Sequence, residues 1–203
     1  MPMAVPGSGL GLGLVLVLVL LLAWPPAWAG APSADGPGGG RGEAPSVYQR
    51  PAAFLAEVFG GRPPRPRVLW LTGGLRRDVA RILGHPPRSL RVRYWARDGR
   101  TAWILEEIGK ERPITVGVVV RDGRIERLRV LIYRESRGME VRHPFFTRRL
   151  EGARLRPDLR LDRRVDAVSG ATLSSRALVR VARLALRLDQ AVRERERGRG
   201  GGP

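Results

Sequence analysis

The sequence predicts an α+β domain, an antiparallel sheet with helices packed on one side. The observations that favour this class are short segments of β-type pattern between residues 90 and 132, Asp-Gly pairs that mark hairpin turns in that region, and an amphipathic helical pattern near the C-terminal end. The 203 residues, less a leader and flexible ends, are enough for one domain with its own hydrophobic core.

Four strands are expected in the β-rich region. They are Leu90 to Trp95, Thr101 to Ile108, a strand that begins at Pro113, and a strand that returns after the Asp122-Gly123 turn. Simple alternation places four apolar side chains of the third strand on one face: Ile114, Val116, Val118 and Val120. The fourth strand is expected to place Leu128, Val130 and Ile132 on one face, with Arg127 and Arg129 on the other.

Helical patterns flank this region. Pro51 to Phe59 can form a short helix, and Leu75 to Leu83 has apolar residues at helical spacing before Gly84 ends it. A longer helix is expected after residue 172, with an apolar side made of Leu173, Ala177, Val181, Leu184, Ala185 and Leu188. Its opposite side is a stripe of Arg176, Arg180, Arg183 and Arg187. This stripe indicates a solvated face, with binding to a membrane surface as the alternative.

The first 29 residues are typical of a secretory signal peptide. Leu10 to Leu22 is an apolar run, short for a membrane span of about 20 residues, and Ala27-Trp28-Ala29 is a small-x-small cleavage site. Because Met1 to Ser8 contains no Lys or Arg, an uncleaved anchor is the alternative. Either way, we expect a bacterial protein that is periplasmic or otherwise extracytoplasmic, soluble after cleavage or anchored to the inner membrane.

The rest of the chain divides by composition. We expect a flexible linker at 30–50, rich in Gly, Pro, Ala and Ser, and an N-terminal helical segment at 51–89. The main domain is expected at 90–190, followed by a disordered basic tail at 191–203.

The net charge of +18 comes almost entirely from arginine, with Lys110 as the only lysine. A partner of opposite sign and a simple composition bias both explain it. The even spread of arginines along the chain favours the bias, and we expect no nucleic-acid partner. The absence of cysteine excludes disulfides, iron–sulfur ligation and a thiol nucleophile. Neither histidine belongs to a pair at metal-ligand spacing, so no metal site is expected.

The segment from Asp166 to Ser175, Asp-Ala-Val-Ser-Gly-Ala-Thr-Leu-Ser-Ser, leads into the last helix. Unpaired N–H groups and the helix dipole favour an anion at such a position. Gly170 and Ala171 leave room for close approach. Hydroxyl donors are available from Ser169, Thr172, Ser174 and Ser175. These residues alone are consistent with a phosphate site, but they favour an ordinary capping segment.

The pattern Asp-x-x-Ser-Gly-Ala-Thr-x-Ser resembles the flavinylation motif of the FMN-binding domain family. This domain occurs in the C subunit of the sodium-translocating NADH:quinone oxidoreductase and in the G subunit of the Rnf complex. In the family, an exported flavin transferase joins the motif threonine to the FMN phosphate by a phosphoester bond. The resemblance covers roughly residues 90 to 185 and assigns the attachment to Thr172. It implies cofactor-binding neighbours at Asp166, Ser169, Gly170, Ala171, Ser174 and Ser175.

A second stretch, Glu135-Ser136-Arg137-Gly138, resembles the Glu-Thr-Pro-Gly turn that the family often has at the end of its last hairpin strand. Arg137 in place of proline departs from the family pattern and changes what is expected of the loop conformation. The resemblance implies that Glu135, Ser136 and Gly138 lie near the flavin.

Taken together, the resemblance implies an exported electron-transfer flavoprotein with covalent FMN, not an enzyme with catalytic residues of its own. It would carry electrons between membrane redox partners. The expected partners are a flavin transferase and a membrane-bound redox protein that acts as electron donor or acceptor, with membrane association if the leader stays uncleaved. The alternatives are a basic module that binds an anionic polymer or membrane surface, and a small flavin-dependent reductase.

Overall fold

The structure is a computed structural model that describes residues 44–200 of the chain. The predicted signal peptide at 1–29 and the linker prediction for 30–43 lie outside these residues, as does the end of the tail at 201–203.

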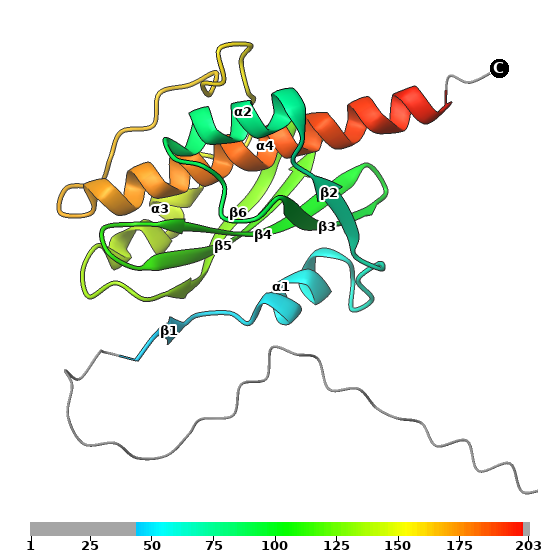
Figure 1. The fold of residues 1–203 in the computed structure, drawn as a ribbon. Coiled ribbons are helices and arrows are strands. Elements are labelled where there is room, and N and C mark those ends of the chain that lie inside the picture. Colours follow the sequence, from blue (N-terminus) through cyan, green and yellow to red (C-terminus); the bar gives the residue numbers. More distant parts are fainter. Residues whose placement is uncertain (1–43, 201–203) are drawn as a thin grey trace, which may run out of the picture. The chain divides into compact units, whose positions relative to one another are not determined.

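One antiparallel sheet of six strands forms the centre of the domain, in the order β1-β6-β5-β4-β3-β2 (Figure 1). From β2 to β6 each strand pairs with the next one along the chain, and β1 adds to the far edge beside β6. The strands are β1 (Ser46–Val47), β2 (Arg67–Trp70), β3 (Arg91–Arg97), β4 (Arg100–Ile108), β5 (Pro113–Arg121) and β6 (Arg124–Tyr133). The α+β class and the antiparallel sheet predicted from the sequence are confirmed.

The Asp-Gly pairs form the hairpin turns that join β3 to β4 and β5 to β6. Asp98 and Asp122 have φ angles of 53° and 52°, and Gly99 and Gly123 have 72° and 69°. Two consecutive residues with positive φ define a type I′ turn, whose twist matches that of the flanking strands. The turn residues therefore fix the register of both hairpins, such as Val118 opposite Leu128.

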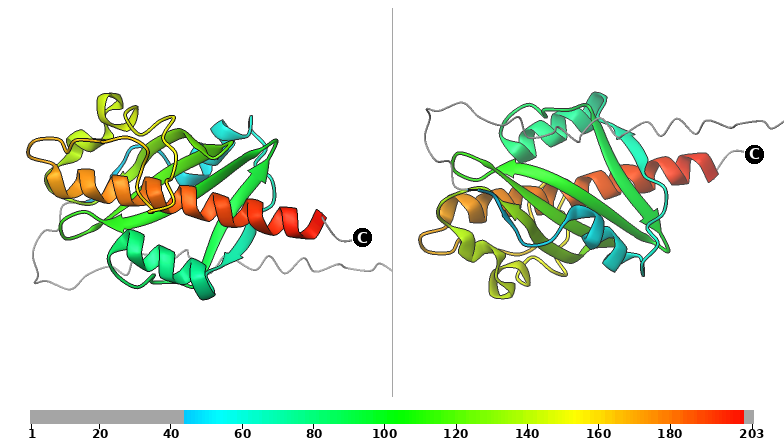
Figure 2. Two further views of the ribbon diagram at one scale, coloured as in Figure 1. Left: turned by 90° about the horizontal axis from the view of Figure 1, so that it is seen from above. Right: turned by 90° about the horizontal axis from the view of Figure 1, so that it is seen from below.

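Helices cover both faces of the sheet, as the views from above and below show (Figure 2). They are α1 (Pro51–Val58), α2 (Gly73–Leu83), the 3-10 helix η1 (Met139–Arg142), α3 (Pro144–Thr147) and α4 (Thr172–Gly200). The long helix α4 and α2 pack on one face, over the larger core cluster. On the other face α1 buries Phe54, Leu55 and Phe59 against the sheet in a separate cluster. The expectation of helices on one side thus holds for α2 and α4 but not for α1.

Strand β6 departs from the simple alternation expected of it. Its pairing with β5 shifts register twice, so that Val116 faces Val130 whereas Thr115 faces Ile132. Between these two pairs Leu131 has no partner on β5, and it is the extra residue of a β-bulge. An extra residue of this kind reverses the face of the side chains beyond it. Consequently Ile132 packs with the α1 cluster, and the prediction that it shares a face with Leu128 and Val130 is wrong.

Both ends of the described chain are more ordered than expected. Within the predicted linker, Ser46 and Val47 pair with β6, and within the predicted helical segment β2 pairs with β3. At the C-terminal end α4 continues to Gly200, so the disordered tail predicted from residue 191 is wrong for 191–200. The physical reason is that Ala191 and Val192 are buried and extend the apolar side of the helix.

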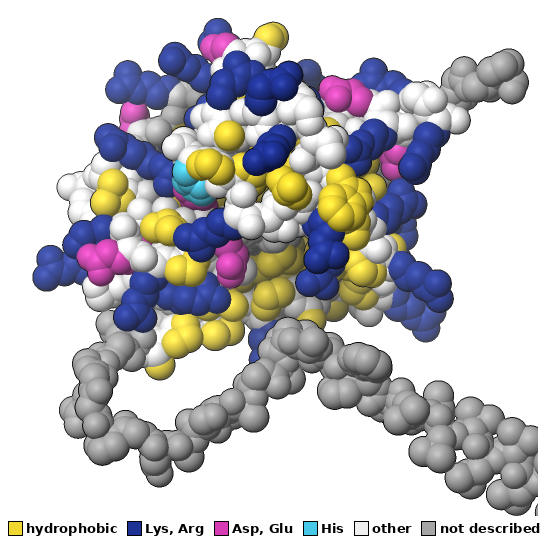
Figure 3. All heavy atoms as spheres, in the orientation of Figure 1, with side chains coloured by type: hydrophobic (Ala, Val, Ile, Leu, Met, Phe, Trp, Pro, Cys, Tyr) yellow, Lys and Arg dark blue, Asp and Glu magenta, His cyan; other side chains and the backbone are white. Residues whose placement is uncertain are grey.

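The arginine stripe of α4 is not a freely solvated face. Arg180 Nε donates a hydrogen bond to Glu107 at 2.8 Å, and Arg187 Nε donates one to Asp78 on α2 at 2.9 Å. Arg187 is only 15% exposed, which makes its ion pair part of the contact between α2 and α4. Of the stripe, Arg176 remains exposed. Figure 3 shows other cationic side chains spread over the visible surface rather than gathered in one block.

Across residues 44–200, no helix combines the length and the apolar composition that a membrane crossing requires.

Candidate functional site

A short loop holds the predicted attachment segment against the start of α4. The Ala171 N–H donates to the Val168 carbonyl at 3.0 Å, and the Val168 N–H donates to the Ser175 hydroxyl at 3.0 Å. Gly170 stands at the tip with φ of 78°, a left-handed conformation that favours glycine, and a Cβ there would meet no atom within 4 Å. The loop is therefore anchored on both sides and open at its tip.

The first turn of α4 offers free backbone donors to an anion. The Ser175 N–H donates to the Ala171 carbonyl at 2.8 Å, which makes Ala171 the N-cap residue. Its methyl group cannot accept a hydrogen bond, unlike the Ser, Thr, Asp or Asn that usually caps a helix. The N–H groups of Thr172, Leu173 and Ser174 therefore have no acceptor within the helix, at the end where the helix dipole is positive.

The hydroxyl groups of the motif differ in their exposure and in their hydrogen bonds. Ser174 and Ser175 are 4% and 1% exposed, and their hydroxyls bond to Tyr133 and to the Val168 N–H. Thr172 and Ser169 are both exposed. Thr172 alone combines an exposed side chain with a place in the first helical turn, so an anion bound there would lie beside its hydroxyl.

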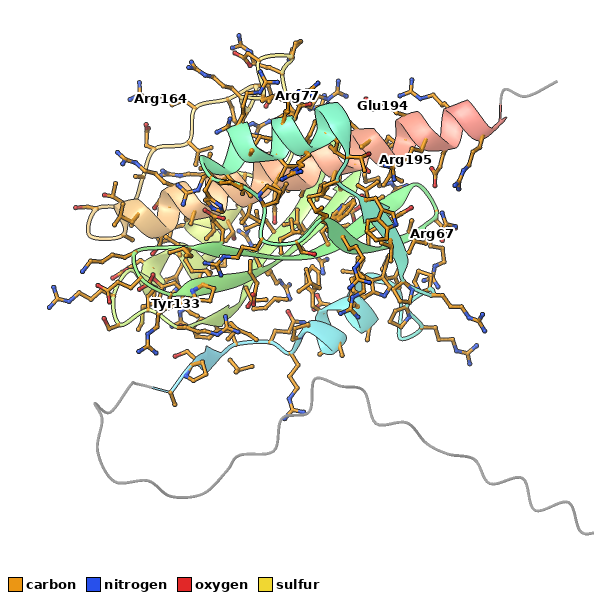
Figure 4. All side chains as sticks on the ribbon, viewed as in Figure 1. Arg67, Arg77, Tyr133, Arg164, Glu194 and Arg195 are labelled. Carbon is orange, nitrogen blue, oxygen red and sulfur yellow. The ribbon has the colours of Figure 1, made fainter. Side chains whose placement is uncertain are left out.

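The second predicted stretch lies directly against the first. The Tyr133 hydroxyl, labelled in Figure 4, donates to the Arg137 carbonyl and lies 2.9 Å from the Ser174 hydroxyl oxygen. Gly138 has φ of 84°, and a Cβ on it would lie 2.9 Å from both the Ser174 hydroxyl oxygen and the Tyr133 hydroxyl oxygen. Only glycine fits this approach. The structure thus brings the Glu-Ser-Arg-Gly turn and the Ser-Gly-Ala-Thr loop together.

Glu135 is occupied with the backbone of the turn between β4 and β5. One of its carboxylate oxygens accepts N–H groups from Lys110, Glu111 and Arg112 at 2.5, 2.8 and 3.0 Å. Burial alone would raise the pKa of Glu135, but these backbone donors outweigh it and hold the pKa below its usual value. A Cβ on Gly109 would lie 2.8 Å from this oxygen and 3.4 Å from the Ser174 hydroxyl oxygen, so Glu135 stands close to the start of α4.

The remaining predicted residues lie at the edge of this region. Asp166 is exposed and pairs with the exposed Arg164 at 2.9 Å, and Ser136 is exposed at the turn. Their roles in binding a cofactor stay predictions.

Two apolar side chains beside the site were not predicted from the sequence. Met139 directly follows Gly138 and is 40% exposed, and Leu173 directly follows Thr172 and is 45% exposed. Singly exposed apolar side chains are common on protein surfaces, and here two of them directly follow residues of the two predicted stretches. The sequence feature that could have pointed to these two residues is their position directly after Gly138 and Thr172.

The fold and the site together define an α+β domain with an exposed threonine hydroxyl in the first turn of its long C-terminal helix. Residues 109–187 match the model of the FMN-binding domain family, and this stretch contains both motifs. The match supports the FMN-binding domain family for this stretch of the chain, as the sequence resemblance predicted, and with it the binding of a flavin. Neither the curated proteins nor the solved structures contained a match.

Proposed function

We propose that the protein is an exported flavoprotein that holds FMN covalently through a phosphoester on Thr172 and carries electrons between membrane redox partners. The observation that supports this most directly is the exposed Thr172 side chain in the first turn of α4, within the stretch that matches the FMN-binding domain. A flavin transferase is the partner that would form the bond.

The residues at the site fit FMN. The free N–H groups of the first turn can bind the phosphate, and the open tip at Gly170 does not obstruct it. The close packing of Gly138 on Ser174 brings the second turn beside the same helix start. Exposed Met139 and Leu173 can cover part of the apolar ring system. When bound, FMN supplies the redox chemistry, while these side chains position it and exclude water.

A covalent bond suits this open site and the proposed location. Outside the cytoplasm a dissociated cofactor is lost by diffusion, and an exposed helix start provides few contacts to retain it. A tether removes the need for a deep phosphate pocket. Arg137, exposed beside the site, would in addition favour an anionic reduced flavin.

The attachment can be tested by in-gel flavin fluorescence after denaturation. The protein is exported from cells that also express a flavin transferase, and it is compared with three variants. Thr172→Ala should give no fluorescent band, whereas Thr172→Ser should retain part of it because the hydroxyl is kept. Ser169→Ala removes the other exposed hydroxyl and should stay fluorescent. A fluorescent Thr172→Ala, or a dark wild-type protein despite an active transferase, would rule out attachment at Thr172.

Two other functions predict different results. A small flavin-dependent reductase would turn over a small substrate with a reduced flavin donor and no partner protein. A basic module for anionic polymers would be colourless when purified and would bind in a strongly salt-dependent way. The family match of residues 109–187 favours a flavin-based function over the second of these.

A further inference from the structure

A hairpin-like loop between α3 and α4 contains a strained residue. Arg156 and Arg160 are joined by a backbone hydrogen bond of 2.8 Å, and the Leu159 N–H donates to the Arg156 carbonyl at 2.9 Å. Leu159 has φ of 63°, a left-handed conformation that a branched, non-glycine residue seldom adopts. Strained residues of this kind concentrate at binding sites, where the surrounding structure holds them in place.

The strained residue Leu159 holds the side chain of Arg183 on α4. The Leu159 carbonyl accepts a hydrogen bond from Arg183 Nε. Among residues 44–200, the two terminal nitrogens of Arg183 have no hydrogen-bond or ion-pair partner. Arg160 and Arg183 line the same cavity. Burial lowers the pKa of Arg183 and the charge of Arg160 lowers it further, against the opposing charge of Asp158. A half-buried guanidinium fixed at Nε presents its two remaining donor groups as a fork, the geometry that binds phosphate or carboxylate oxygens.

These arginines line a cavity of about 450 Å³ beside α4. Its charged lining is Arg156, Arg160, Asp162, Arg163, Arg164 and Arg183. The figures show this loop above α2 and α4, with Arg164 labelled on it and cationic side chains around it (Figures 3 and 4). Val165 and Val179 add an apolar wall, which the cavity shares with a neighbouring one of about 390 Å³.

The arginines around the cavity outnumber the acidic residues that pair with them. Arg156, Arg163 and Arg164 pair with Asp158, Asp162 and Asp166. Within the described residues Arg160 and Arg183 have no acidic partner at ion-pair distance. Asp158 acts on Arg183 from beyond ion-pair distance and accepts the Arg160 N–H, and the five arginines and three aspartates around the cavity still leave a net charge of about +2, which matches a dianion.

We propose that this cavity binds the dianionic phosphate group of a small soluble molecule through Arg183 and Arg160, separately from the flavin. The apolar wall formed by Val165 and Val179 would contact the organic part of that molecule. The cavity is open to solvent, and its volume is within the range of small-molecule sites.

The test is isothermal titration of the exported protein with inorganic phosphate and with glycerol 3-phosphate, in chloride buffers of matched ionic strength. Saturable binding is expected, and Arg183→Gln and Arg160→Gln should each weaken it at least tenfold. Arg93→Gln removes one exposed charge from β3, where the described residues offer it no ion pair, and should leave affinity within twofold. Arg160→Gln keeps the test valid if Arg183→Gln fails to fold, because Arg160 is exposed on the loop.

Other results overturn the proposal. Absence of saturable phosphate binding would contradict the proposed site. Equal weakening by Arg93→Gln would mean that binding depends on the general positive charge of the protein. Loss of binding in Thr172→Ala would place the phosphate in the flavin site. Sedimentation with phosphatidylglycerol vesicles is run alongside, and Arg183-dependent vesicle binding without binding of the soluble phosphates would identify a lipid headgroup as the ligand instead.

Discussion

At the residue scale, the candidate site depends on which hydroxyl groups already make hydrogen bonds within the protein and which remain exposed. The buried hydroxyls of Ser174 and Ser175 hold the loop and the neighbouring turn, so they are structural groups in this fold. Thr172 lies between these contacts and the open tip at Gly170, with its side chain exposed. The same short motif thus supplies both the reactive hydroxyl of our proposal and the bonds that position it.

Tyr133→Phe should loosen the contact between the two motifs. The variant removes the hydroxyl that donates to the Arg137 carbonyl and accepts from the Ser174 hydroxyl, so both groups lose this partner. We expect a loss of about 1–3 kcal/mol in the free energy of unfolding, measured by urea denaturation. Flavin incorporation should also fall, because the turn at Gly138 is then less firmly held beside α4.

The matched control is Tyr94→Phe. Tyr94 is also buried, but its hydroxyl makes no hydrogen bond among the described residues. Equal losses of stability in the two variants would show that the Tyr133 hydroxyl contributes nothing specific.

Glu135→Gln should make stability depend less on pH. Backbone N–H groups of the β4–β5 turn hold the folded-state pKa of Glu135 below its unfolded value near 4.5. A lowered folded pKa stabilises the protein above the unfolded pKa, and this contribution is lost as pH falls through the folded pKa. The wild-type protein should therefore be more stable than the variant at pH 7, with the difference disappearing in acid. Urea denaturation across this pH range measures it, and a difference that stays constant into acid would contradict the account.

At the element scale, the sheet shows where sequence patterns are sufficient and where they fail. The Asp-Gly turns and the alternation in β5 identify both hairpins, because turn chemistry and period are local properties. The bulge at Leu131 leaves no local signature, so the face of Ile132 could not be predicted. The position of α1 also depends on a distant feature, since Phe54 packs onto Gly117 of β5.

Gly117→Ala should weaken the packing of α1 on the sheet. A Cβ at residue 117 would lie 2.7 Å from two atoms of the Phe54 ring, closer than side chains tolerate. We expect a loss of about 1–3 kcal/mol by urea denaturation. Gly198→Ala is the control, because no atom lies within 4 Å of its Cβ and alanine favours a helix. If Phe54→Leu does not relieve the effect of Gly117→Ala in the double variant, the clash is not its cause.

At the scale of the whole molecule, the chain brings together two stretches separated in sequence. Both motifs could be found in the sequence by resemblance, but their contact depends on the return of the chain from β6 through η1 and α3 to α4. Tyr133, which joins them, could not be assigned this role from the sequence, since a tyrosine at the end of a strand has no distinctive pattern. The ion pairs of Arg180 and Arg187 on α4 could not be predicted for a similar reason, because their acidic partners lie on β4 and α2.

The measurement that tests the central claim most directly is mass spectrometry of one tryptic peptide. Cleavage after Arg164 and Arg176 yields residues 165–176, which contain Ser169, Thr172, Ser174 and Ser175. We predict that this peptide carries the mass of FMN less one water and that fragmentation places it on Thr172. An unmodified peptide from protein exported with an active transferase, or the added mass on any of the three serines, would contradict the account.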